Sequence, residues 1–253
     1  MFRMINLDAT HADALLKEFD AKTTLDDRYT IDLLCCQSLV HGADGRAPAS
    51  TLLAGRLGLT RSCFATARCH SEQEGVARGL ALLTASGIWV LNSGSFAIGT
   101  RQETTTVQFA LIRKRNASVL VLNVHLASVA LIRNMQLAAL FTHPLLREPY
   151  GAVALCADRA AALHAKEWQV LTAPSRYATH HVQEDAPGGM LCLLHARFAP
   201  IARVSVAACP SDLPGITLEF DVEPLRATKS NRPAFPLSFR EQWLGYREHR
   251  SFA

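Results

Sequence analysis

An aspartate that directly follows an apolar run is the residue of this sequence best placed to do chemistry. Residues 150–160 read YGAVALCADRA, a pattern typical of a buried strand that ends at Asp158 and continues into Arg159 and Ala160. A carboxylate at a strand end can hold a metal ion or orient a phosphate, and it can equally cap a helix that begins near Arg159. Both interpretations of Asp158 stay open at this point.

Asn6 and His125 also stand near the ends of predicted strands. Asn6 lies in the apolar run 2–7, and His125 ends the run 118–125. Asparagines in such places, Asn123 included, commonly fix strand ends through side-chain hydrogen bonds. A lone histidine at a strand end is commonly a structural residue. Asn6, His125 and Asp158 are therefore the polar residues that the predicted strand ends present.

A second polar cluster lies in the segment 180–189, which reads HHVQEDAPGG. Its composition predicts a long polar loop. His180, His181, Glu184 and Asp185 could complete a site from a neighbouring loop, but a solvated loop is the favoured interpretation.

Strands must supply most of the framework that positions these residues. The short turn around Arg115 and Asn116 leaves too few residues for a crossover, so it predicts an antiparallel hairpin and hence a mixed sheet. Strand-like runs occur at 2–7, 30–37, 61–67, 79–84, 88–91, 104–114, 118–125, 151–156, 190–196, 200–208, 215–222 and 234–239.

Helices are expected between some of these strands. Asp8, Ser128 and Asp158 are the candidate N-caps. Apolar residues recur at helical spacing in the segments 9–19, 47–57 and 128–146.

The composition indicates one globular domain. Of the 253 residues, 49% are hydrophobic and 19% are charged, and no linker, repeat or low-complexity segment divides the chain. We therefore predict a single domain over residues 1–253, in which 240–253 form a C-terminal extension with aromatic residues on a polar background.

The seven cysteines indicate a reducing, intracellular compartment, either cytoplasmic or organellar. They are odd in number and include no Cys-x-x-Cys pair, and Cys69 and His70 are adjacent and so poorly spaced for a zinc site. The first apolar run is too short for a signal peptide, and no run reaches the ~20 apolar residues of a membrane span. The sequence thus predicts neither membrane association nor a small-molecule cofactor.

Basic residues offer weak candidates for phosphate or nucleic-acid contact. The net charge of +4 is as well explained by a solvated surface as by an anionic partner. Arg113, Lys114 and Arg115 lie at the predicted hairpin tip, and Lys229 and Arg232 lie near the C-terminus. Small clusters of this kind more often serve solubility than binding, so we treat them as secondary candidates.

Five short motifs occur in one order along nearly the whole chain. They are the segments 5–6, 32–38, 122–126, 155–160 and 230–233, which read IN, DLLCCQS, LNVHL, LCADRA and SNRP. In order, spacing and chain length they resemble the endonuclease/exonuclease/phosphatase superfamily, which has the deoxyribonuclease-I-like fold. The strand at 79–84 and the pair Arg133 and Gln136 also match that pattern.

This resemblance implies an architecture. The expected fold class is α/β (α+β), a four-layer sandwich in which two packed mixed β-sheets are flanked by helices. The functional site is expected at one edge of the paired sheets.

The resemblance also implies a reaction, the Mg²⁺-assisted hydrolysis of a phosphate ester. The family holds its metal with a glutamate at the position of Ser38. Mg²⁺ takes oxygen ligands and usually one or two carboxylates, so an uncharged hydroxyl is a poor replacement. We therefore expect no bound cofactor, with Mg²⁺ as the alternative.

Two further family positions are altered. The asparagine that follows the strand-end aspartate by two residues is Ala160, which cannot form a side-chain hydrogen bond. The family's aspartate and histidine near the C-terminus are Asn231 and Arg232. An arginine stays protonated, so Arg232 can contact a phosphate but cannot act as a base.

These substitutions predict a pseudoenzyme, in which Asn6, His125 and Asp158 are retained but insufficient for catalysis. The predicted function is that of a structural or binding subunit in a larger assembly, with protein partners expected and RNA as a candidate partner. The alternative is an active Mg²⁺-dependent phosphodiesterase, nuclease or phosphatase with a rearranged site, in which Asp158 and His125 act with the loop at 180–189. A third and weaker interpretation is plain nucleic-acid binding through the basic tips.

Overall fold

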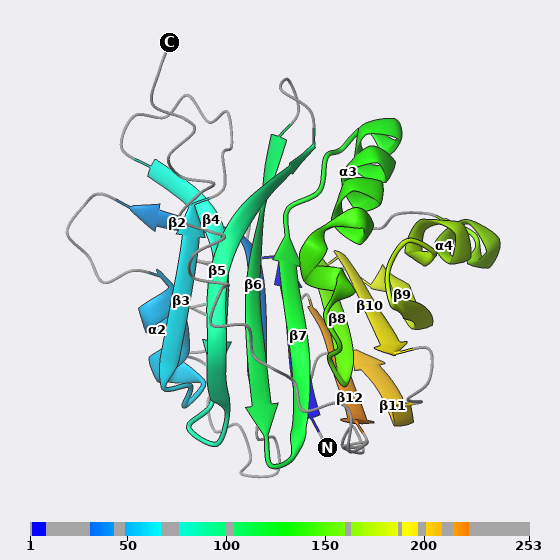
Figure 1. The fold of residues 1–253 in the computed structure, drawn as a ribbon. Coiled ribbons are helices and arrows are strands. Elements are labelled where there is room, and N and C mark those ends of the chain that lie inside the picture. Colours follow the sequence, from blue (N-terminus) through cyan, green and yellow to red (C-terminus); the bar gives the residue numbers. More distant parts are fainter. Residues whose placement is uncertain are drawn as a thin grey trace.

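Two six-stranded β-sheets form the centre of the molecule. The computed structural model describes residues 2–8, 31–42, 49–66, 76–99, 104–159, 163–186, 189–196, 201–208 and 215–222. The first sheet has the order β11-β12-β1-β2-β4-β3 and the second has the order β5-β6-β7-β8-β10-β9 (Figure 1). Parallel β1–β2 and β7–β8 pairs combine with antiparallel neighbours, so both sheets are mixed.

The strands of the first sheet are β1 (Phe2–Asp8), β2 (Leu33–Gly42), β3 (Arg61–Thr66), β4 (Val76–Thr84), β11 (Ile201–Ala208) and β12 (Gly215–Val222). Those of the second are β5 (Trp89–Gly99), β6 (Thr104–Lys114), β7 (Ala117–Val124), β8 (Ala152–Ala157), β9 (Tyr177–Ala186) and β10 (Gly189–Ala196).

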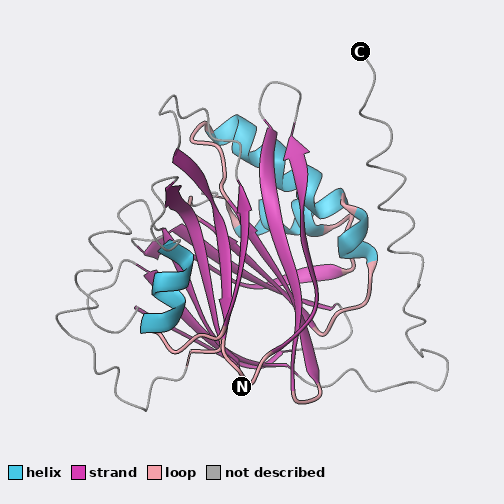
Figure 2. Ribbon diagram, turned by 90° about the vertical axis from the view of Figure 1, so that its left-hand side faces the viewer, coloured by secondary structure: helices cyan, strands magenta, loops and turns pink. Residues whose placement is uncertain are grey.

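Helices cover the two outer faces of the paired sheets (Figure 2). Helix α2 (Ala49–Arg56) buries Leu53 against the outer face of the first sheet. Helices α3 (Ala130–Thr142) and α4 (Ala165–Thr172), with the short 3₁₀ helix η1 (Pro144–Arg147), pack on the outer face of the second. A third apolar cluster fills the space between the sheets. The predicted four-layer α/β sandwich is therefore confirmed.

The central strands β7 and β8 show why the sequence folds in this way. Every residue of β8 is buried, as are the last six of β7, because one face of these strands meets the other sheet and the other face meets the helices. Their sequences are accordingly almost uninterrupted apolar runs, as expected for strands covered on both sides. Polar residues appear only where these runs end, and those ends carry the candidate site.

Most of the predicted strands are confirmed within the described residues, and so is the hairpin at Arg115, which takes a positive φ of 54° in its turn. Position 79 requires glycine, because a Cβ there would lie 2.5 Å from the carbonyl oxygen of Ala65. The predictions at 9–19 and 234–239 fall outside the described residues.

One prediction was wrong, and two others had the wrong bounds. The predicted loop at 180–189 is mostly strand β9, which extends to Ala186 and pairs with β10, because backbone pairing outweighs its polar composition. The predicted helix at 128–146 divides at His143, since Pro144 lacks the backbone N–H that would continue it. The strand predicted at 88–91 continues to Gly99, through an exposed polar stretch.

Neither of the candidate N-caps Ser128 and Asp158 caps a helix among the described residues. Helix α3 is preceded by Val129, and Asp158 uses its oxygens elsewhere. The next described helix, α4, is instead capped by His164 together with Glu167. No helix among the described residues has the length and apolar character needed to cross a bilayer.

Candidate functional site

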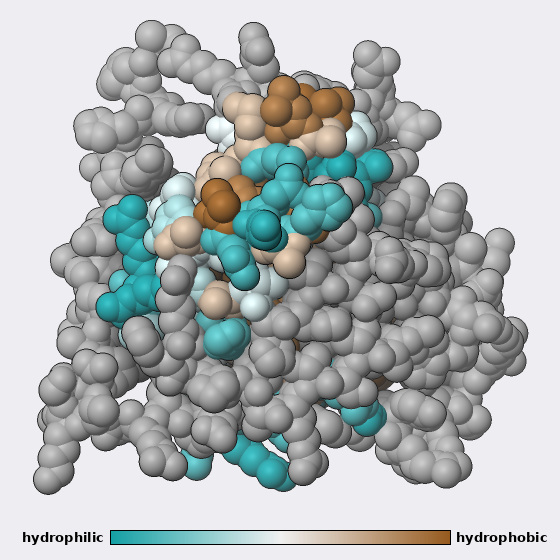
Figure 3. All heavy atoms as spheres, turned by 90° about the vertical axis from the view of Figure 1, so that its right-hand side faces the viewer, coloured by the Kyte–Doolittle hydropathy of each residue, from teal (hydrophilic) through white to brown (hydrophobic). Residues whose placement is uncertain are grey.

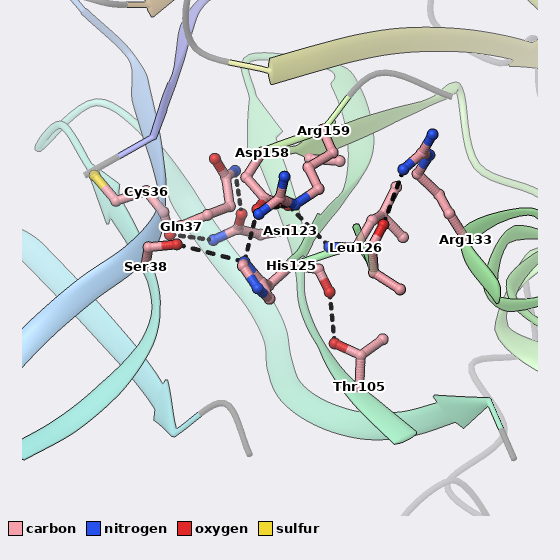
Figure 4. A network of polar contacts seen from close by, with 12 residues as sticks. Cys36, Gln37, Ser38, Thr105, Asn123, His125, Leu126, Arg133, Asp158 and Arg159 are labelled. Carbon is pink, nitrogen blue, oxygen red and sulfur yellow. Dashed lines mark hydrogen bonds and ion pairs between the residues drawn. The ribbon is translucent and has the colours of Figure 1, made fainter. Parts of the chain in front are cut away.

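The parallel pairing of β7 and β8 places His125 and Asp158 side by side. Val124 and Ala157 are partners in the register, so the residues that follow them leave the sheet at the same edge. His125 Nδ1 lies 2.7 Å from Asp158 Oδ2, and Asp158 Oδ1 accepts a hydrogen bond of 2.8 Å from the backbone N–H of Leu126 (Figure 4). The Asp158 side chain is only 2% exposed, whereas that of His125 is 30% exposed. Asp158 thus fixes both the histidine ring and the backbone behind it.

A β-bulge brings Ser38 to the same place from the other sheet. The pairing of β2 with β4 shifts between Cys36 and Leu39, and Ser38 takes a positive φ of 58°, which is uncommon for a residue other than glycine. Its Oγ lies 3.4 Å from His125 Nδ1 (Figure 4). The position that resembles the family's metal-binding glutamate therefore points into the candidate site.

Ser38, His125 and Asp158 do not form a nucleophilic triad. In such a triad the carboxylate and the serine contact opposite nitrogens of the imidazole ring. Here both approach Nδ1, and Nε2 has no hydrogen-bond partner among the described residues. The arrangement cannot relay a proton from Ser38 through the ring.

Side chains from α3 and β6 support the loop that carries His125. Arg133 Nη1 donates to the carbonyls of Ala127 and Ser128 at 2.9 and 3.0 Å, and Gln136 Oε1 accepts from the N–H of Ala127 at 2.9 Å. Thr105 Oγ1 donates to the carbonyl of His125 at 2.6 Å. The predicted pair Arg133 and Gln136 therefore holds the loop after His125 in place, and Thr105 does so too.

A buried network of side-chain amides connects the two sheets beneath the site. Gln37 Nε2 donates to Asn6 Oδ1 at 2.6 Å and to Asn123 Oδ1 at 2.7 Å. Asn6 Nδ2 in turn donates to the carbonyls of Ala157 and Met190, both at 3.0 Å. Asn6 therefore bridges the two sheets, in line with its strand-end interpretation.

Asn123 and Gln108 continue this network into the second sheet. Asn123 Nδ2 lies 3.0 Å from the carbonyl of Cys36, at the point where the β2–β4 ladder is interrupted, and 3.3 Å from Gln108 Oε1. Gln108 Nε2 donates to the carbonyl of Cys63 at 2.9 Å. Sequence reasoning missed Gln108, although a glutamine within the apolar run 107–112 was the available signal.

The residues that the structure describes at the site do not fit a magnesium ion. Each oxygen of Asp158 already has a hydrogen-bond or ion-pair partner, and the other side-chain oxygen that the described residues place beside His125 is the neutral hydroxyl of Ser38. Among the described residues, no three His, Cys, Asp or Glu side chains gather where they could share a metal. A hard cation needs more carboxylate oxygen than this arrangement provides.

Cysteines near the site are poor nucleophiles. Burial raises the pKa of the Cys36 thiol, which precedes Gln37 in β2. Burial, together with a hydrogen bond to Cys156, raises the pKa of Cys35 as well. The thiolate is the reactive form, so these buried thiols are inert at neutral pH.

Arg159 lies at the site, whereas the predicted basic residues of the hairpin lie at the far end of the second sheet. Arg159 follows Asp158 and its Nε lies 3.6 Å from Asp158 Oδ2, with the side chain 47% exposed. The hairpin tip at Arg113 and Arg115 lies at the opposite end of β7, ~25 Å from His125 by strand rise. Lys114 is already engaged, because its Nζ lies 2.6 Å from Asp32 Oδ2.

Several predicted site residues lie outside the described residues, namely Ala160, Lys229, Asn231 and Arg232, and so do the side chains of His180, His181, Glu184 and Asp185. Their predicted roles stay predictions.

Comparison with solved structures identifies the fold. The catalytic domain of human Nocturnin, solved with bound sulfate, matches with a TM-score of 0.60 and 13% identity over 88% of this chain and 93% of that one. An endonuclease/exonuclease/phosphatase family protein from Leptotrichia buccalis matches at 0.61 and 9% over 88% and 100%. The endonuclease/exonuclease/phosphatase from Bacteroides vulgatus matches at 0.58 and 11% over 88% and 99%.

No protein-family model matches the sequence, and no curated protein matches it significantly. The low identities and the extensive coverage together show that this chain has the endonuclease/exonuclease/phosphatase fold, and that its sequence is highly divergent. The resemblance seen in the five motifs is thus confirmed for the fold.

Proposed function

We propose that this protein is a catalytically degenerate protein of the endonuclease/exonuclease/phosphatase fold that acts as a structural or binding subunit of a larger assembly. Protein partners are expected, and RNA is a candidate component. One observation carries the proposal: Ser38 occupies the bulge that faces His125, so the site has a hydroxyl where the fold's enzymes place a metal-binding glutamate.

The contacts and identities of the other polar residues at the site also support an inactive site. One carboxylate oxygen of Asp158 contacts His125, and the other accepts a hydrogen bond from the backbone N–H of Leu126. These contacts favour a structural role for Asp158. Each acid, base or positioning group of an enzyme contributes about 10²- to 10⁴-fold to the rate, and groups that act together are not additive. Loss of the glutamate, and of the asparagine that is Ala160 here, removes such groups together.

A role in binding is supported by what the chain has kept and by what it exposes. The loop-supporting side chains and the buried amides are joined by several hydrogen bonds, so the site region remains an ordered scaffold. Val129, Leu131 and Met135 on and before α3 are 55%, 70% and 48% exposed. Figure 3 shows apolar side chains gathered at the upper part of the face that carries α3 and α4. Contiguous exposed apolar side chains of this kind mark surfaces that bind partners.

The test is a hydrolysis assay with mixed short DNA and RNA substrates and a generic phosphate ester, in Mg²⁺ and in Mn²⁺. Wild type is compared with Asp158→Asn and with His125→Ala, after thermal melting has confirmed that both variants fold. We expect no metal-dependent rate in wild type above that of either variant. Metal-dependent turnover that both substitutions abolish would contradict the proposal.

A metal-dependent phosphodiesterase or phosphatase with a rearranged site is the second candidate. The observation that favours it is the His125–Asp158 pair, whose ring is partly exposed and whose Nε2 has no described partner. This candidate requires a second carboxylate within coordination distance of Asp158, supplied from outside the described residues. The same assay separates the two candidates.

A further inference from the structure

Strand β5 forms an edge of the second sheet and differs from the other edge strands. It has eleven residues, none of which is charged and none of which is proline, and eight of them are exposed. The other edge strands carry charges in their sequences: Arg61 in β3, Arg203 in β11, and Glu184 and Asp185 in β9. Charged side chains and proline are the usual devices by which proteins prevent an edge strand from pairing.

Among the described strands, none pairs with the outer edge of β5. The described elements that pack extensively on β5 are β6 on its paired side and α3 on one face (Figure 1). Phe96 and Ile98 belong to the apolar cluster beneath α3, so the strand is held rigidly in place. By contrast, the edge strands β9 and β11 contact each other across the two sheets. β5 is thus an anchored strand whose outer row of backbone groups has no described partner.

Two exposed side chains at the start of β5 suit a protein partner rather than water. Trp89 is 63% exposed and Leu91 is 39% exposed, and large apolar residues of this kind are the common anchors of protein interfaces. A bulge between Val90 and Asn92 interrupts the pairing near the start of the strand. The run 92–99 is regular, and it therefore supplies the segment that can add another strand.

We infer that β5 is a self-association edge, at which a second copy of this chain adds its own β5 as an antiparallel neighbour. Two identical strands paired in this way are related by a two-fold axis, so the contact is closed and yields a dimer rather than a fibre. Because β5 carries no charge, every register of the pair avoids like charges in opposition. This inference rests on the edge strand alone and holds whether or not the site hydrolyses phosphate esters.

Sedimentation velocity of the full chain, from low to high micromolar concentration, tests the inference. Wild type is expected to shift from monomer to dimer as its concentration rises. Ser95→Lys places an ammonium group at the middle of the regular run in both copies, so it should raise the dimer dissociation constant by at least about tenfold. Gln169→Lys, an exposed position on α4, adds the same charge away from the edge and should leave the dimer intact.

Amide hydrogen exchange gives a second measurement on the same samples. Amides of the run 92–99 should exchange more slowly in the dimer than in the monomer, whereas those of β3 should not change. A wild-type chain that stays monomeric throughout the concentration range would overturn the inference and leave β5 as an edge for another protein's strand. A dimer that persists equally in Ser95→Lys and Ala97→Lys would also overturn it.

Discussion

Substitution of Asn123 tests the view that the amide network fastens the two sheets together beneath the site. Asn123 is fully buried, and its Nδ2 lies within 3.0 to 3.3 Å of three acceptors. The amide carries two hydrogens, so it makes at most two good donor bonds, and Oδ1 accepts a third bond from Gln37. At ~1 kcal/mol net for each bond, and with a small cavity added, Asn123→Ala should cost ~3–4 kcal/mol of unfolding free energy.

Urea denaturation followed by circular dichroism measures this loss. The urea midpoint should fall while the denaturant slope stays constant, because the substitution leaves the surface area exposed on unfolding nearly unchanged. Asn116→Ala in the exposed hairpin turn is the matched control and should change stability by less than ~0.5 kcal/mol. A loss below ~1 kcal/mol in Asn123→Ala would refute the assignment of the network as a fastening between the sheets.

Three further outcomes follow from other parts of the fold. Lys114→Met leaves the buried carboxylate of Asp32 without its cation and should lower stability by ~1–2 kcal/mol in urea titrations; a neutral result would show that Lys114 is dispensable to the fold. Burial lowers the pKa of His143, whose Nδ1 accepts from the N–H of Leu145, so stability should be full above the unfolded pKa of about 6.5 and should fall as the pH drops below it. Melting between pH 7 and 5 should show this fall in wild type and less of it in His143→Asn, which keeps a capping acceptor. Burial raises the pKa of Cys36, so a thiol reagent should label this residue only after unfolding, and rapid labelling of the native chain would contradict its burial.

The elements that follow directly from local pattern are those that sequence reasoning placed well. The apolar runs of β7 and β8 end in polar residues, and the family motifs give their order, so His125 and Asp158 could be located before their contact was known. The 2.7 Å contact itself depends on the register of two parallel strands, which an apolar run does not specify.

The features that sequence reasoning missed depend on tertiary contacts. The bulge at Ser38 arises from the pairing of β2 with β4, and nothing in the local sequence marks a serine for positive φ. Strand β9 is polar and β5 contains the Asn-Ser-Gly-Ser stretch 92–95, so both contradict strand propensity and are held by their neighbours. Asp158 resembled a helix cap because an aspartate after a strand fits both roles, and only the position of His125 decides between them.

Binding of Mn²⁺, followed by electron paramagnetic resonance of the free ion, tests the central claim most directly. The account predicts that wild type removes no free Mn²⁺ signal at micromolar metal, because Ser38 offers no charge and Asp158 is committed to His125 and Leu126. Ser38→Glu, which returns a carboxylate to the bulge, should bind more Mn²⁺ than wild type. Stoichiometric binding by wild type that disappears in Asp158→Asn would contradict the account, since the site would then hold the metal that a phosphate-ester hydrolase of this fold requires.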